Sequence, residues 1–258
     1  MEKSVCYVCF EYALSDNLPI YAGGLGVLAA DYYFAAATSQ IPYYFTGLLY
    51  HHGFETNDRS DWQFDSQSNE LTLLRDENDE IVSVDIDINT RPLLAQVWIK
   101  KEGNATLFLF DTNLPGNSDQ DKEITASLYG PSDQIKILQQ LVLGIGTVKL
   151  MRRLGLKPTI YHLNEGHTSF VLLALLAQIK GSLPEIKLED ALNQVKNMTV
   201  ASKHTILHAS GLFIDEKMFN QYLSQFLKRH NFIANEIFKL GKNYTHVNKF
   251  STNAFLIN

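Results

Sequence analysis

The stretch Thr159-Ile160-Tyr161-His162-Leu163-Asn164-Glu165-Gly166-His167 decides the fold. Its first five residues have the apolar and β-branched character of a strand. The next four are polar residues and a glycine, which favour a tight loop, and residues 170–179 then form an apolar run typical of a buried helix. The order strand, polar loop, helix is the repeating unit of an α/β protein.

Two other stretches have the same order. An apolar strand over residues 5–10 precedes a glycine loop at residues 21–26 and a helical run over residues 27–40. A strand over residues 198–201 is followed by Lys203-His204-Thr205 and later by an amphipathic helix over residues 215–228. We therefore expect an α/β fold with a mainly parallel sheet that is covered by helices on both faces.

The region between the first two units, residues 62–113, has a different pattern. Residues 82–88 alternate strictly between apolar and polar side chains, and residues 96–100 and 106–110 continue in this style around a hairpin turn at residues 101–104. This pattern predicts an antiparallel β insertion that is carried on the sheet.

A long helix is predicted over residues 133–154. Gly155 directly after it and Pro158 shortly beyond are typical stop signals. The apolar residues at helical spacing are Ile137, Leu141, Ile145 and Val148.

Composition excludes several classes of protein. The 258 residues are 45% hydrophobic and carry a formal net charge of −6 without any basic run, which argues against disorder and against a nucleic-acid partner. Residues 170–177, the longest apolar run, are too few to cross a bilayer, and residues 1–10 make a poor signal peptide. We expect a cytoplasmic protein with no membrane partner.

The two cysteines, Cys6 and Cys9, form a C-x-x-C motif that is open to two interpretations. The motif could be a redox pair or half of a metal site. It lies within an apolar strand rather than at a helix start, so two small buried hydrophobic residues are the favoured interpretation. A zinc site built from His162, His167, His204 and His208 is a further alternative, but the spacing does not favour it and we expect no metal.

Polar loops follow all three predicted parallel strands, where α/β proteins bind ligands. The loop Gly23-Gly24-Leu25-Gly26 opens a helix, and its backbone N–H groups are suited to an anion such as phosphate, although the loop could be a mere tight turn. Asn164, Glu165 and His167 could grip several sugar hydroxyls at once; helix capping is the alternative for the first two. His204 ends the third strand and is either a site residue or a satisfied structural histidine.

Taken in order, these motifs resemble those of the α-glucan (glycogen, maltodextrin or starch) phosphorylases, particularly the shorter bacterial and archaeal type. The resemblance extends over nearly the whole chain. It rests on residues 10–14, 18–31, 47–50, 53–54, 142–146 and 161–167, and on Thr199-Val200 with His204-Thr205.

The resemblance implies the Rossmann-like N-terminal half of a two-domain GT-B glycosyltransferase fold. It also implies cleavage of α-1,4-glucans by inorganic phosphate to give glucose 1-phosphate, with pyridoxal phosphate as cofactor. By the same resemblance, Gly23, Gly24, Leu25 and Gly26 approach the phosphate. Asn164, Glu165 and His167 shape the sugar site, and His204 touches the transferred glucose, so His167 and His204 are the expected catalytic residues.

The resemblance also predicts what this chain lacks. We expect residues 1–258 to be a truncated N-terminal phosphorylase domain without the C-terminal cofactor domain, because no lysine here lies in a motif matching the cofactor lysine. Its partners would be α-glucan, phosphate and a C-terminal half polypeptide or a second copy.

Departures from the family pattern at Leu138, Gln140 and residues 206–210 leave a non-catalytic glucan-binding or regulatory remnant as the alternative. A transferase that uses a sugar nucleotide shares the glycine loop but has a basic residue before it, which this chain lacks.

Overall fold

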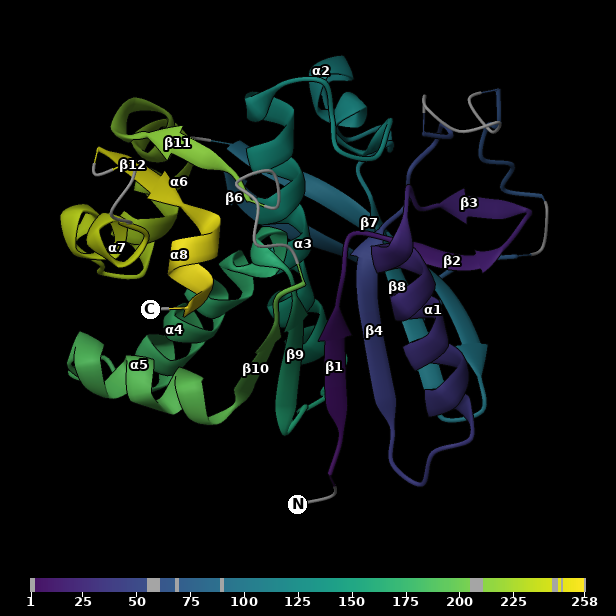
Figure 1. Ribbon diagram of the computed structural model, residues 1–258, viewed down its shortest axis with the longest axis horizontal. Helices are drawn as coiled ribbons and strands as arrows, with labels where there is room; N and C mark the ends of the chain where they lie inside the picture. Colours follow the sequence, from purple (N-terminus) through teal and green to yellow (C-terminus); the bar gives the residue numbers. More distant parts are fainter. Residues whose placement is uncertain are drawn as a thin grey trace.

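The computed structural model describes residues 3–54, 61–67, 70–88, 91–204, 211–242, 246 and 248–257. One sheet of eight strands organises them, in the order β10-β9-β1-β4-β8-β7-β5, with β6 paired to β7 (Figure 1). The strands of this sheet are β1 (Val5–Val8), β4 (Tyr43–Leu48), β5 (Thr72–Leu73), β6 (Ser83–Ile88), β7 (Arg91–Glu102), β8 (Ala105–Asp111), β9 (Ile160–Asn164) and β10 (Thr199–Ser202).

Five of these strands form the predicted parallel core. β1 lies in the middle and pairs in parallel with β4 on one side and β9 on the other. β10 continues the sheet beyond β9, and β8 continues it beyond β4, again in parallel. This arrangement confirms the prediction of an α/β fold with a mainly parallel sheet, and it fits a Rossmann-like fold.

Helices cover both faces of the parallel core. Phe45 and Thr46 are consecutive on β4, so their side chains point to opposite faces. The Phe45 ring packs against Tyr33 of α1 (Gly24–Ala37), with ring centroids 5.3 Å apart. The Thr46 hydroxyl lies 2.8 Å from that of Thr147 on α3 (Asp133–Arg153). The two helices therefore lie on opposite sides of the sheet.

The long helix α3 is the centre of its layer. Ser132 caps its first turn by accepting a hydrogen bond from the Ile135 N–H, and Gly155 follows its end with a φ of +68°. This confirms the predicted helix and its glycine stop. On the same side of the sheet lie α4 (Phe170–Ser182), which packs on α3, and α5 (Leu188–Asn197), which packs on α4.

The antiparallel strands predicted within residues 62–113 are present, and they belong to the main sheet. β7 pairs antiparallel with β6 on one side and with β8 on the other. The turn between β7 and β8 contains Gly103, which has a φ of +52°. β8 also pairs in parallel with β4, so the hairpin extends the parallel core without a break.

The remaining elements lie around this core. After β1, the strands β2 and β3 form a small hairpin. An aromatic cluster around Phe250 holds the last elements together, and the Phe250 ring stacks on Phe170 with ring centroids 6.1 Å apart. The elements are β2 (Tyr12–Ser15), β3 (Leu18–Ile20), α2 (Asp119–Lys122), η1 (Glu123–Thr125), η2 (Gly166–Thr168), β11 (Phe213–Asp215), α6 (Glu216–Arg229), α7 (Ala234–Leu240), β12 (Lys249–Ser251) and α8 (Thr252–Ile257).

Among the described residues, no helix combines the length and the hydrophobicity that a bilayer-spanning segment requires.

Close packing of α3 against α4 yields a stability prediction. A Cβ atom at Gly144 would lie 2.6 Å from the Phe170 carbonyl carbon, whereas one at Gly181 would meet nothing within 4 Å. We expect Gly144→Ala to lower the free energy of unfolding by about 1–3 kcal/mol through overpacking. Gly181→Ala is the matched control and should be neutral or slightly stabilising. Urea denaturation measures both, and equal stabilities would contradict the packing.

Candidate functional site

The strand register brings the predicted polar loops to one edge of the sheet. Val8 at the end of β1 pairs with Leu163 of β9, and Ser202 at the end of β10 pairs with Asn164. Parallel strands end at the same edge, so the residues that follow β1, β9 and β10 lie side by side (Figure 1). This edge holds the strand-end cluster, which we define as Glu11, Tyr129, Asn164, Glu165, His167 and His204.

Asn164 is fully buried, and both ends of its amide are used inside the protein. Its nitrogen donates to the Tyr7 hydroxyl at 2.5 Å, and its oxygen lies 3.1 Å from Nε2 of His204. The amide therefore positions the His204 imidazole, whose side chain is otherwise exposed. The structure thus gives Asn164 a positioning contact to a second predicted site residue.

Glu165 makes a second link to the end of β10. Its Oε1 accepts a hydrogen bond from the His204 backbone N–H at 2.6 Å, and its side chain is buried. Its φ of 69° and ψ of 168° lie in a region that is essentially reserved for glycine. Such a backbone costs about 1–3 kcal/mol and persists where the surroundings fix it, which is common at ligand sites.

His167 is buried directly behind this loop. Its ring stacks on Phe10, with centroids 4.3 Å apart, and burial lowers its pKa from 6.5 to about 3. The imidazole is therefore neutral at physiological pH. Within the described part of the chain, its Nε2 has no hydrogen-bond partner, and an unsatisfied buried polar atom of this kind calls for an explanation such as a functional role.

Hydrogen bonds to the Glu11 carboxylate connect the glycine loop to the strand-end cluster. Gly23 is the N-cap of α1, so the helix begins at Gly24, three residues before the predicted start at residue 27. The buried Glu11 carboxylate accepts hydrogen bonds from the N–H groups of Ala22 at 2.9 Å and Gly23 at 3.1 Å. Gly24 and Leu25 are the first helical residues, and their N–H groups have no acceptor within the helix.

Tyr129 joins the two halves of the cluster. Its hydroxyl donates to the other oxygen of Glu11, and its ring edge faces His167 at a centroid distance of 6.5 Å. Burial, followed by the charge of Glu11, raises the pKa of Tyr129 far above its usual value. The hydroxyl therefore stays protonated and remains a donor to the carboxylate.

Most of the predicted site residues lie in one connected cluster, which also contains two residues that were not predicted. Asn164, Glu165 and His204 are in direct contact, and His167 and Gly23 connect to one another through Tyr129 and Glu11. Glu11 and Tyr129 were not predicted as site residues. A carboxylate directly after the apolar strand at residues 5–10 was a signal for Glu11, whereas nothing near Tyr129 in the sequence marks its role.

The structure bears on two alternatives from the sequence: the redox or metal role of the two cysteines, and the zinc site built from histidines. Cys6 and Cys9 are free thiols and completely buried, and burial raises the pKa of Cys9 to about 12, so they are small core residues. The described residues contain no group of three or more His, Cys, Asp or Glu side chains that could hold a metal. His208 of the zinc alternative and residues 206–210 lie outside the described residues.

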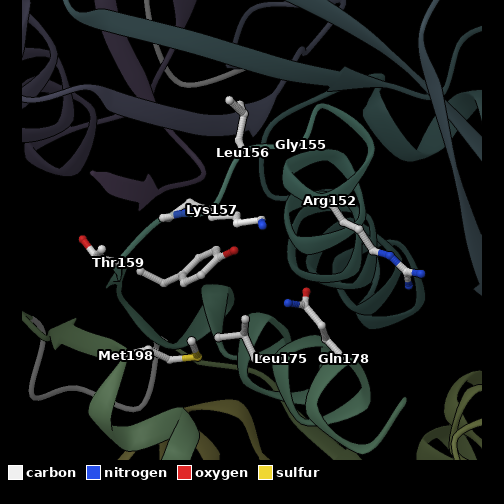
Figure 2. Close-up of a pocket in the computed structure, with 10 residues that line it drawn as sticks. Arg152, Gly155, Leu156, Lys157, Thr159, Leu175, Gln178 and Met198 are labelled. Atoms are coloured by element: carbon white, nitrogen blue, oxygen red, sulfur yellow. The ribbon is translucent and has the colours of Figure 1, made fainter. Parts of the chain in front are cut away.

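A separate pocket of about 420 Å³ lies at the opposite edge of the sheet (Figure 2). It lies between the end of α3, the segment leading into β9, and α4, with Lys157 and Gln178 among its lining residues. Because it precedes β9 rather than following it, this pocket is distinct from the strand-end cluster.

Fold and cluster together define a class: an α/β protein with a Rossmann-like sheet and a polar site at the carboxyl ends of its parallel strands. No protein-family model matches the chain. It is 34% identical over 213 residues to the maltodextrin phosphorylase of Thermococcus litoralis, covering 79% of this chain and 25% of that protein.

Two further relatives are glycogen phosphorylases. The protein of Aquifex aeolicus is 30% identical over 236 residues, which cover 88% of this chain and 33% of the relative. The protein of Mycobacterium tuberculosis is 29% identical over 219 residues, which cover 80% and 25%. The resemblance to the α-glucan phosphorylases is thus confirmed, and the chain spans a quarter to a third of the length of these curated relatives.

The buried neutral His167 makes stability depend on pH. With a folded pKa near 3 and an unfolded pKa near 6.5, the unfolded chain binds more protons between these values, so stability falls as the pH drops below about 6.5. This group alone contributes up to about 1.4 kcal/mol per pH unit. The variant His167→Phe keeps the stacking on Phe10 but has no titrating ring. Between pH 7 and pH 5, we expect its free energy of unfolding to fall by about 2 kcal/mol less than that of the unmodified protein.

Urea denaturation at several pH values measures this difference, and NMR of the imidazole reports its protonation directly. Parallel stability profiles for the two proteins, or a His167 ring that titrates near pH 6.5, would contradict the buried neutral state.

Proposed function

We propose that this chain forms the sugar-binding part of an α-1,4-glucan phosphorylase, which releases glucose 1-phosphate from glycogen or maltodextrin with inorganic phosphate. The observation that carries the proposal is the buried, unpartnered Nε2 of His167 in a cluster of carboxylate, amide and imidazole groups. Relatives that are named maltodextrin and glycogen phosphorylases support it.

The groups of the cluster have separate roles in this proposal. The Nε2 of neutral His167 binds a sugar hydroxyl, and its burial excludes water from that contact. The exposed His204 touches the glucose that is transferred, and Asn164 and Glu165 hold its ring and backbone in place. Asn164 acts as a positioning residue because its own amide is already bonded within the protein.

Phosphate would bind at the start of α1. The N–H groups of Gly24 and Leu25 point out of the first helical turn, where the helix dipole favours an anion. A Cβ atom at Gly23 or Gly24 would meet nothing within 4 Å, so the backbone is open to approach. The Glu11 carboxylate occupies the donors of Ala22 and Gly23, and the Gly26 N–H donates to the Gly23 carbonyl at 3.1 Å, which leaves Gly24 and Leu25 as the phosphate contacts to test.

Pyridoxal phosphate does not fit the residues present. The cofactor is held as a Schiff base by a lysine shielded from water. No lysine among the described residues is buried, and Lys203 beside His204 is exposed. We therefore assign no step to the cofactor in this chain and propose that a further polypeptide supplies it, together with the second half of a GT-B fold. Residues 1–258, including residues 62–113, would form the first half in the cytoplasm.

A non-catalytic glucan-binding protein is the second candidate. The exposure of the lysines favours it: all of the described lysines are accessible to water, so none is suited to hold the cofactor. Both candidates bind glucan at the same site, and only the first releases glucose 1-phosphate from it.

The experiment measures binding and turnover separately. We expect the isolated chain to bind maltoheptaose in calorimetry without releasing glucose 1-phosphate. His167→Phe should weaken binding roughly tenfold, because one hydrogen bond to a buried group is lost. His230→Phe, on the far end of α6, is the matched control and should bind normally.

Release of glucose 1-phosphate should begin when the chain is combined with a polypeptide that covers the rest of a phosphorylase relative. Glucan binding with no turnover in that mixture supports the non-catalytic candidate. Failure of the unmodified chain to bind maltoheptaose overturns both.

A further inference from the structure

The pocket in Figure 2 lies at the edge of the sheet opposite to the strand-end cluster, and the proposed function does not use it. Its volume of about 420 Å³ suits a molecule the size of a substituted ring. A large part of its wall is apolar and consists of Leu156, Pro158, Leu175 and Met198. A mostly apolar hollow with a few polar groups is the general form of a small-molecule site.

Tyr161 on β9 supplies a buried polar group to this wall. The residue is only 4% exposed, and its hydroxyl makes no hydrogen bond among the described residues. Burial raises the pKa of Tyr161 above its usual range, so the hydroxyl keeps its proton and can donate it. Buried polar groups are nearly always hydrogen-bonded, so this donor in a pocket wall calls for an acceptor.

The charges at the pocket are positive. Lys157 and Arg152 line it, neither forms an ion pair with a described residue, and the described lining contains no acidic side chain. This excess of cations runs against the whole chain, whose formal net charge is −6. Figure 2 shows the Lys157 side chain and the Gln178 amide directed into the same space, from the segment before β9 and from α4. The pocket therefore favours an anion.

The apolar wall distinguishes between kinds of anion. A nucleotide or a sugar phosphate brings a doubly charged group and several hydroxyls, which would lose their hydrogen bonds to water against the apolar wall. A monocarboxylate with a compact hydrocarbon body has a single polar end. That end matches the donors of Lys157 and Tyr161, and the body matches Leu175 and Met198.

We propose that this pocket binds a small monocarboxylate with an apolar body, such as an aryl-substituted short-chain acid. The Lys157 ammonium pairs with the carboxylate, and the Tyr161 hydroxyl donates to one of its oxygens. The hydrocarbon body lies against Leu175 and Met198. The site is separate from the strand-end cluster, so this proposal stands whether or not the chain binds glucan.

The test uses 3-phenylpropionate as the probe and its neutral amide, 3-phenylpropionamide, as the matched ligand. The reporter is the NMR signal of the Met198 methyl group, which is one of four methionine signals and is assigned with the variant Met198→Leu. We expect the carboxylate to shift this signal with a dissociation constant of about 1 mM, which is ordinary for so small a ligand. The amide should bind roughly tenfold more weakly, because it lacks the charge.

Two variants locate the carboxylate. Lys157→Gln and Tyr161→Phe should each weaken binding of 3-phenylpropionate roughly tenfold, because each removes one hydrogen bond to a charged group. Lys187→Gln removes an exposed lysine at the start of α5 that does not line the pocket, so it is the matched control and should bind normally. A thermal melt verifies that each variant is folded.

Three results would overturn the proposal. In the first, 3-phenylpropionate leaves the Met198 methyl signal unmoved at ten times the expected dissociation constant. In the second, the carboxylate and the amide bind equally well, or Lys157→Gln binds as well as Lys187→Gln. In the third, phenyl phosphate binds more tightly than the carboxylate, which would make the pocket a phosphate site.

Discussion

The carboxylate of Glu11 accepts hydrogen bonds from Ala22 and Gly23 at the start of α1 and from the hydroxyl of Tyr129. A buried charge is tolerated only when such donors surround it, so the end of β1, the glycine loop and the segment before α3 must keep these positions. Tyr129 in turn places a ring edge against His167. One carboxylate thus ties together loops that are more than a hundred residues apart in the sequence.

Strand pairing and side-chain hydrogen bonds each hold a different part of the strand-end cluster in place. Parallel pairing fixes where the strands end, and the Asn164 amide, which donates to the Tyr7 hydroxyl, holds the His204 ring through its oxygen. The strained backbone of Glu165 persists because its side chain is held by the His204 N–H. Each of these contacts uses up a polar group of the protein, whereas the buried Nε2 of His167 has no partner among the described residues.

The sequence predicted the parallel core and α3 with its glycine stop, because hydrophobic period and turn residues are local signals. It also placed residues 164–165 and His204 in loops after parallel strands, without their contacts. The partnership of Glu11 with Tyr129 could not be predicted, since it depends on tertiary packing across 118 residues. The position of β8 was also hidden: its alternating pattern reveals a strand but not the parallel partner β4. Burial of the Asn164 amide is a similar case, because its residue type alone suggested a ligand contact.

Charge explains how the proposed chemistry would divide between this chain and the further polypeptide of the proposal. The Glu11 carboxylate and the Asn164 amide are already bonded within the protein, and the cluster also contains the Glu165 carboxylate and the neutral imidazole of His167, groups suited to neutral hydroxyls. Phosphate requires positive charge, and among the described residues at this edge the dipole at the start of α1 and the exposed Lys203 attract it. Because Glu11 lies against that same helix start, part of its positive potential is already neutralised. Under the proposed function, we therefore expect sugar binding to be the contribution of this chain, and further cations for the phosphate to come from a partner polypeptide.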